Sequence, residues 1–185
     1  APPHKDEIHE FREYLINRSA ESRIKIKFNQ AVDEKIIAAE KPDAVVFASG
    51  AKPFLPPVRG LSESSFYLAE NAFYYHIPED HVVIIGGGQV GCELGEFLLE
   101  RGKKITIIEI LPKICADVEF LNRKLLLKRL EERKPAIITG ARITRIENHT
   151  VVFVDASGEE KSLPYGALVL AAGYQPDEAL FHLWR

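Results

Sequence analysis

The 185-residue sequence contains no methionine, one tryptophan and two cysteines. It also lacks an excess of either charge, because 24 basic residues are set against 27 acidic ones and the formal net charge is −3. Such a chain has no cationic field that could hold a nucleic-acid backbone or an anionic lipid surface. The sequence therefore predicts neither nucleic acid nor membrane among its partners.

Long hydrophobic runs are missing as well. The longest, such as residues 167–172, have the length of a strand, whereas a bilayer-spanning helix needs about 18 apolar residues. The first residues, Ala-Pro-Pro-His-Lys, contain no signal-peptide core, and Cys92 and Cys115 form no CxxC pair. We therefore expect a cytoplasmic protein without a disulfide framework. The missing initiator indicates a processed chain or a piece of a longer one.

What is present is the composition of an ordinary globular protein, with 46% apolar and 28% charged residues, which excludes disordered and fibrous classes. The N-terminal part mixes helical and strand periodicities and ends at a proline-rich stretch, residues 51–60, where we expect a domain boundary. The patterns before it predict helices over residues 6–19 and 33–40, and strands over residues 23–28 and 44–48.

The remainder alternates buried strands with helices and then changes to short alternating segments. This order predicts a parallel sheet followed by an antiparallel meander. The expected helices cover residues 69–75, 90–101 and 118–133; the expected parallel strands cover residues 81–85, 104–108, 136–139 and 167–172; the meander covers residues 143–146, 151–154 and 160–163.

The loop between the strand at residues 81–85 and the next helix reads Gly-Gly-Gly-Gln-Val-Gly, the GxGxxG pattern of dinucleotide-binding loops. Gly86 permits a tight turn, Gly88 lets the backbone approach a pyrophosphate, and Gly91 lets the helix pack close to the sheet. Free N–H groups and the helix dipole then hold the diphosphate. The candidate cofactor-binding residues of this loop are Gly86, Gly87, Gly88, Gln89, Val90 and Gly91.

Glu109 ends the next strand, 18 residues after Gly91, where a carboxylate can accept hydrogen bonds from the ribose hydroxyls of an adenosine. A 2′-phosphate would meet like charge there. No arginine follows within ten positions and only Lys113 could compensate, so the sequence favours NAD over NADP. Ile110 and Lys113 complete this end of the candidate site.

Two further segments share one pattern: an apolar strand, then small residues and glycine, then proline. The first contains Ser49 and Gly50, and the second contains Ala172 and Gly173. Such turns can bring bare backbone close to a bound dinucleotide, although each could be an ordinary strand-to-loop turn. NAD and FAD use the same kind of cradle, so the loop alone does not choose between them.

Taken together, the segments ASGAKPFLPPVRG, IIGGGQVGCELGEFLLERGKKITIIE and LVLAAGYQP look like a two-dinucleotide flavoprotein reductase. With PPHKDEI and ILPKICADVEFLNRKLLLKRL, nearly the whole chain resembles the C-terminal part of the NADH:flavin oxidoreductase family, which includes 2-enoate reductase, 2,4-dienoyl-CoA reductase and trimethylamine dehydrogenase. The resemblance implies an α/β fold, a Rossmann-like parallel sheet with an antiparallel β-meander, in a three-layer FAD/NAD(P)-binding domain.

The same resemblance implies three parts: residues 1–60 as a remnant of an FAD-binding domain, residues 61–170 as an NAD(P)-binding Rossmann domain, and residues 171–185 returning to the FAD domain. The chain would position the nicotinamide of NAD(P)H for hydride transfer to flavin N5. Glu109 and the loop glycines would hold NAD, Ala172 and Gly173 would lie near the nicotinamide, and Ser49 and Gly50 would face FAD.

The sequence departs from that family by lacking the first glycine fingerprint, the FMN and iron–sulfur barrel, and the cluster cysteines. Its expected partners are therefore NAD(P)H and the missing FAD, FMN and iron–sulfur domains of a parent protein. No catalytic acid or base and no metal ligand set is predicted. Cys92 is expected to be a packing residue without a resolving partner, and Cys115 to be inert.

Two alternatives remain open at this point. One is a non-catalytic module that senses ADP or NAD, and the other is a self-contained dehydrogenase. The second would need a convergent His, Lys or Tyr base, which the sequence does not display.

Overall fold

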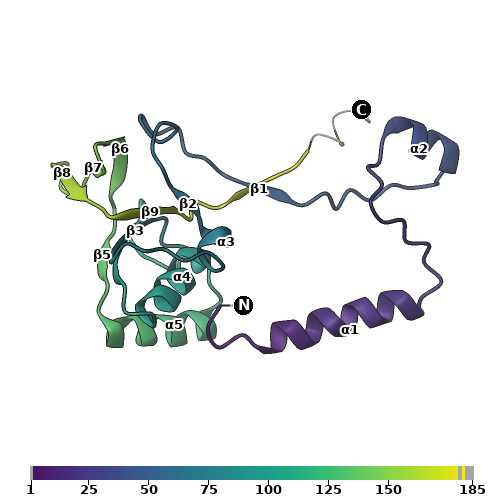
Figure 1. Cartoon of the computed structure of the whole chain (residues 1–185), viewed down its shortest axis with the longest axis horizontal. Coiled ribbons are helices and arrows are strands. Elements are labelled where there is room, and N and C mark those ends of the chain that lie inside the picture. Colours follow the sequence, from purple (N-terminus) through teal and green to yellow (C-terminus); the bar gives the residue numbers. More distant parts are fainter. Residues whose placement is uncertain (1, 179–180, 182–185) are drawn as a thin grey trace. The chain divides into compact units, whose positions relative to one another are not determined.

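The computed structural model describes residues 2–178 and residue 181 of the chain. They fall into two compact units, and Figure 1 labels the elements of both. The first unit comprises Ala1–Lys5 and Pro53–Gly173, and the second comprises Asp6–Lys52 and Tyr174–Arg185. Each unit is described by itself.

The centre of the first unit is a five-stranded sheet in the order β2-β9-β3-β4-β5, in which every neighbouring pair is parallel. Strand β3 lies in the middle and pairs Val83 with Thr106 of β4 and with Leu168 of β9. The strands are β2 (Tyr67–Leu68), β3 (His81–Ile85), β4 (Lys104–Ile108), β5 (Ala136–Ile138) and β9 (Ala167–Leu170).

Both faces of this sheet are covered, which explains the continuous apolar sequence of β3. Val82 and Ile84 pack toward the helices, whereas Val83 and Ile85 point to the opposite face, as the two-residue repeat of a strand requires. The helices of the first layer are α3 (Ala69–Ala72), α4 (Gln89–Leu99) and α5 (Phe120–Arg133).

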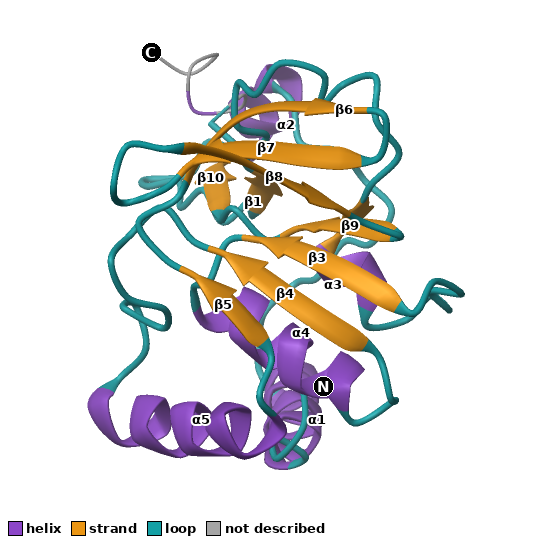
Figure 2. Ribbon diagram, turned by 90° about the vertical axis from the view of Figure 1, so that its left-hand side faces the viewer, coloured by secondary structure: helices purple, strands orange, loops and turns teal. Residues whose placement is uncertain are grey.

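The opposite face carries an antiparallel meander in the order β6-β7-β8, made of β6 (Arg142–Glu147), β7 (Thr150–Val154) and β8 (Glu160–Pro164). Val151 and Phe153 of β7 pack with Val83 and Ile85 of the parallel sheet. Figure 2 shows the three layers, with the meander on one side of the sheet and α4 and α5 on the other. The fold class predicted from the sequence is confirmed.

The second unit contains α1 (Glu7–Glu21), α2 (Glu34–Glu40) and a pair of short strands, β1 (Ala51–Pro53) with β10 (Tyr174–Pro176). The side chain of Asp33 caps α2 by accepting a 2.9 Å hydrogen bond from the Ile36 amide. Ile37 is the single buried residue among the described residues of this unit. Among the described helices of the chain, none is long and apolar enough to cross a bilayer.

Two strands predicted in the second unit are wrong. Residues 23–28 and 44–48 are irregular, and Ile24 and Val46 are 68% and 89% exposed. Alternating or continuous apolar residues make a strand possible, but a strand forms only beside a hydrogen-bonding neighbour, and the described residues provide none for either segment. The functional division at residues 60 and 170 stays a prediction, because packing does not show which ligand each part binds.

Candidate dinucleotide-binding site

The glycine loop leaves the carboxyl end of β3 and enters α4, at the sheet edge where open parallel sheets bind their ligands. Gly86 has a φ of +105°, and a Cβ at this position would lie 2.2 Å from the carbonyl oxygen of Ala171. Its amide donates a 2.9 Å hydrogen bond to Ile108 O. The turn out of β3 therefore requires glycine both for its conformation and for its contact with the end of β9.

Gly91 lies on the first turn of α4, where a Cβ would stand 1.9 Å from the carbonyl oxygen of Gly86. The third glycine of the pattern thus lets the helix start directly against the loop and the end of β9. Gly95, one turn further on, faces the sheet: its Cβ would be 3.2 Å from Ile107 Cδ1. The pattern did not include Gly95, which shares the same packing face at a spacing of four residues.

Glu109 is buried, with 7% of its surface exposed, and its carboxylate is turned into the loop. Oε2 accepts a 2.5 Å hydrogen bond from the Gly87 amide, and Oε1 accepts a 2.7 Å bond from the Leu111 amide. The sequence places this carboxylate against a ribose; the structure shows it fastening two backbone segments. Since each carboxylate oxygen has two lone pairs, a ribose hydroxyl could add to these bonds without replacing them.

Asp117, which the sequence reasoning missed, lies at the N-terminus of α4. Its Oδ1 and Oδ2 are 2.9 and 3.1 Å from the Gln89 amide, and a Cβ on Gly88 would be 3.0 Å from Oδ2. The exposed carboxylate is an anion held by the N-terminal amide and dipole of the helix. The N-terminus of α4 therefore already holds one anionic group, and a diphosphate at the Gln89 amide would have to displace Asp117.

The other residues proposed from the loop differ in their surroundings. Gln89 Nε2 donates a 2.9 Å hydrogen bond to Glu93, which also pairs with Lys5. The side chains of Val90, Ile110 and Lys113 are exposed. They are accessible to a ligand, and within the described part of the chain no hydrogen bond or ion pair of their side chains fixes a role for them.

The second small-residue turn lies beside the loop. A Cβ on Gly86 would be 3.2 Å from the amide nitrogen of Ala172, so the end of β9 and the glycine loop are in direct contact. Gly173 follows with a φ of +95°, and its carbonyl accepts a 2.9 Å bond from the Phe54 amide. The structure thus brings Ala172 to the same sheet edge as the predicted diphosphate cradle.

Ser49 and Gly50 belong to the second unit. Ser49 Oγ donates a 2.8 Å hydrogen bond to Asp177 O, and the Asp177 amide donates a 3.1 Å bond to Gly50 O. Gly50 has a φ of +86°. These contacts hold the turn to the chain segment that follows β10, and the predicted role of the turn toward FAD stays a prediction.

Cys92 is buried, as expected of a packing residue, and Cys115, which the sequence does not bring near it, lies beside it. Cys92 Sγ donates a 3.2 Å hydrogen bond to Gly87 O, and the Cys115 amide donates a 2.7 Å bond to the same oxygen. Both cysteines are completely buried. The contact with Cys115, and then burial, raise the pKa of Cys92, whereas the contact with Cys92 lowers the pKa of Cys115. The two cysteines are 23 residues apart in the sequence, so no sequence motif indicates that they are neighbours.

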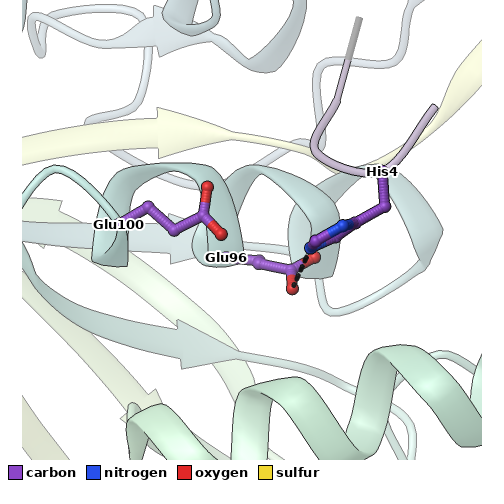
Figure 3. A group of neighbouring side chains, drawn as sticks. All are labelled: His4, Glu96 and Glu100. Carbon is purple, nitrogen blue, oxygen red and sulfur yellow. Dashed lines mark ion pairs between the residues drawn. The ribbon is translucent and has the colours of Figure 1, made fainter. Parts of the chain in front are cut away.

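A second cluster, His4 with Glu96 and Glu100, has the residue types of a metal site (Figure 3). His4 Nε2 lies 3.8 Å from Glu96 Oε1. Both glutamates have arginine partners on α5: Arg129 reaches Glu96 at 2.5 and 3.1 Å, and Arg133 reaches Glu100 at 2.7 Å. The cluster is an ion-pair network that joins α4 to α5, because its negative charges are already compensated.

A three-layer Rossmann-type fold with a glycine loop at the carboxyl end of its central strand defines a dinucleotide-binding protein. Residues 6–183 match the family described as pyridine nucleotide-disulphide oxidoreductase, and the chain belongs to this family. FAD and pyridine nucleotide are the cofactors of the family, which confirms the cofactor prediction at that level. The family match does not favour the sensing module.

The similar proteins described here are much longer than this chain. The chain is 32% identical to a bilirubin reductase of Mediterraneibacter gnavus (strain CC55_001C) and 30% identical to an NADH oxidase of Thermoanaerobacter brockii, in each case over 95% of this chain and 28% of the relative. A solved structure of 2-naphthoyl-CoA reductase with 2-naphthoyl-CoA is 26% identical, with a TM-score of 0.85 over 98% of this chain and 28% of that one. The chain thus spans little more than a quarter of these proteins.

Proposed function

We propose that the first unit binds NAD(P)H through residues 86–91 and presents its nicotinamide to the flavin of an FAD-dependent oxidoreductase. The observation that carries this proposal is the anion-binding loop: the amides of Gly87 and Gln89 already hold two carboxylates, those of Glu109 and Asp117. A diphosphate offers the same kind of negatively charged oxygen to the Gln89 amide in place of Asp117, while Glu109 keeps the Gly87 amide.

The chain's own part in this function is binding and orientation. The amides at the start of α4 hold the diphosphate, Glu109 accepts from the adenosine ribose, and Ala172 with Gly173 lies on the nicotinamide side. When bound, the reduced nicotinamide supplies a hydride, which the flavin accepts at N5. Because the cofactors carry the chemistry, no general acid or base is required of these residues.

Glu109 also supports a preference for NADH over NADPH. Its carboxylate is buried and fixed by two backbone amides, so it cannot easily turn away from a 2′-phosphate that approaches the ribose position. Exposed Lys113 is the cation that could compensate from the adjoining loop. We therefore propose NADH as the preferred donor.

The second unit is proposed to be part of an FAD domain that is completed by other segments of a parent protein. Exposed Ile24, Phe28 and Val46 lie in segments whose sequence predicts strands, and additional strands would both pair and cover them. The proposed division is residues 1–60 for the FAD-domain remnant, residues 61–170 for the NAD(P) domain and residues 171–185 for the return. Membership in the group that includes 2-enoate reductase, with its FMN and iron–sulfur barrel, belongs to this proposal.

Parallel calorimetric titrations with NADH and NADPH test the binding function. We expect saturable binding of NADH, weaker binding of NADPH, and a smaller difference between them in Glu109→Gln, which keeps an acceptor for the Gly87 amide but loses the charge. Glu132→Gln, an exposed change near the far end of α5, is the matched control for net charge. The absence of binding by either nucleotide would refute the proposed function.

A further inference from the structure

The two cysteines meet beneath the glycine loop although no part of the proposed function uses them. Cys92 comes from the first turn of α4, and Cys115 comes from the loop that follows β4. The thiol of the first and the amide of the second donate to one oxygen, Gly87 O, at 3.2 and 2.7 Å. The pair therefore adjoins Gly87, whose amide holds the buried carboxylate of Glu109.

Cys115 is buried directly beneath a short surface segment of the loop that follows β4. Its φ is +53°, a left-handed conformation that residues with a Cβ adopt at a cost. The next two residues, Ala116 and Asp117, are exposed, so the buried thiol is separated from solvent by a short surface segment. Because both thiols are completely buried, an oxidant reaches the pair only when this segment opens.

We propose that Cys92 and Cys115 form a reversible disulfide in the presence of a hydroperoxide, and that this disulfide weakens NAD(P)H binding at the glycine loop. The second half of the statement rests on the proposed function. The first half concerns only the chain and its two sulfur atoms.

The reaction uses one hydroperoxide molecule for each disulfide. The Cys115 thiolate attacks a peroxide oxygen, so that an S–O bond forms, the O–O bond breaks, and the leaving oxygen takes up a proton. The Cys92 sulfur then attacks the sulfenic sulfur, the S–S bond forms, and hydroxide leaves with the Cys92 proton as water. Two thiols lose two electrons and two protons, and hydrogen peroxide becomes two molecules of water.

The surroundings suit this order of events. In the reduced chain the Cys92 S–H donates to Gly87 O, and the same S–H can turn to the Cys115 sulfur once that thiol loses its proton. This contact lowers the pKa of Cys115 and favours its thiolate, whereas contact with Cys115 and burial keep Cys92 protonated by raising its pKa. Cys92 therefore acts as the resolving thiol.

A disulfide would also change the loop itself. Cys92 loses the S–H group that donates to Gly87 O, and an S–S bond of about 2 Å requires the two backbone segments to adjust. The Gly87 amide holds Glu109 Oε2, so an adjustment of the peptide at Gly87 also shifts the carboxylate that is proposed to accept from the ribose. Loss of that carboxylate's position is the expected cause of weaker binding.

Mass spectrometry of the purified 185-residue chain after hydrogen peroxide treatment tests the disulfide. Since the sequence contains two cysteines, a monomer that loses about 2 Da and cannot be alkylated after unfolding holds the Cys92–Cys115 bond. Dithiothreitol should restore two alkylatable thiols. Thiols that stay alkylatable after peroxide treatment, or that gain oxygen without bridging, would overturn the proposal.

Calorimetric titration with NADH tests the effect on binding. We expect the oxidised chain to bind NADH at least about five-fold more weakly than the reduced chain, with recovery after dithiothreitol. In Cys92→Ser, which keeps a hydroxyl donor for Gly87 O, peroxide should produce no mass loss and no change in affinity. Equal affinity of oxidised and reduced chains would refute the effect on binding. A reduced chain that binds no NADH would overturn both that effect and the proposed function, and the mass measurement would still decide the disulfide.

Discussion

Replacing Gly91 by alanine tests whether the first turn of α4 must touch the glycine loop. The added Cβ would lie 1.9 Å from Gly86 O and 3.3 Å from Ala171 Cβ. Gly86 O is a backbone atom of a turn that is itself fixed by contact with the end of β9, so it cannot swing away as a side chain could. The helix and the loop must separate instead.

The change in the free energy of unfolding of Gly91→Ala is the sum of two opposing contributions. Overpacking costs about 1–3 kcal/mol and more where backbone must move, whereas alanine in place of glycine favours a helix by roughly 1 kcal/mol. We expect Gly91→Ala to lower the free energy of unfolding by about 2 kcal/mol. For a protein of this size, that corresponds to a melting temperature lower by about 4–8 °C.

Gly95→Ala is the matched control, because it lies on the same helix and face. Its Cβ would approach Ile107 Cδ1 at 3.2 Å, the flexible end of a side chain, so the gain in helix propensity offsets a small repacking cost. We expect a melting temperature close to that of the unchanged chain. Thermal unfolding followed by circular dichroism measures both variants, and an equal loss in the two would refute the argument from the Gly86 carbonyl.

Three further outcomes follow from the structure. Asp117→Asn should tighten NADH binding by roughly three- to ten-fold in calorimetry, because it removes a negative charge from the N-terminus of α4 and keeps an acceptor for the Gln89 amide. The control Glu132→Gln should leave NADH binding unchanged. Unchanged or weaker NADH binding in the Asp117 variant would contradict this expectation. Arg129→Met should lower the free energy of unfolding in urea by about 2–3 kcal/mol, because buried Glu96 of α4 loses its main counter-charge. A decrease as small as that of an exposed ion pair would show that His4 compensates the charge of Glu96. Burial, and then the charge of Lys104, lower the pKa of His81 in the folded chain. As pH falls below about 6.5, the unfolded chain therefore takes up a proton before the folded chain does, and the free energy of unfolding should decrease in acid. His81→Gln should remove this part of the pH dependence.

The sequence alone predicts the elements whose local pattern agrees with their packing in the folded protein. The sequence predicts β3, the glycine loop, α4 and β4, because each has a local signal. The buried strands are continuous apolar runs, the loop has three glycines, and the helix is amphipathic. The meander could be predicted as well, because its strands are separated by turn residues; Asn148 and His149, between β6 and β7, adopt the left-handed conformation that a tight hairpin turn requires. These features depend on neighbours in the chain.

Strand formation in the second unit depends on neighbours elsewhere, and there the prediction failed. Residues 23–28 alternate as a strand does, but alternation describes which side chains could share a face and says nothing about a pairing partner. The short strands β1 and β10 show the converse: three residues each, with no recognisable pattern, are ordered as strands because they pair with each other.

Asp117 and the contact between Cys115 and Cys92 were missed for a related reason, since the partners lie across a loop whose path the sequence does not reveal. Their contacts, with that of Glu109, change the view of binding at the glycine loop. The Gly87 and Gln89 amides are already hydrogen-bonded to carboxylates, as backbone donors in a folded protein are expected to be. A dinucleotide at Gln89 therefore exchanges one anion for another, and its affinity is the difference between two hydrogen-bonding states. The residues that set this difference, Asp117 above all, lie outside the glycine pattern by which such loops are found.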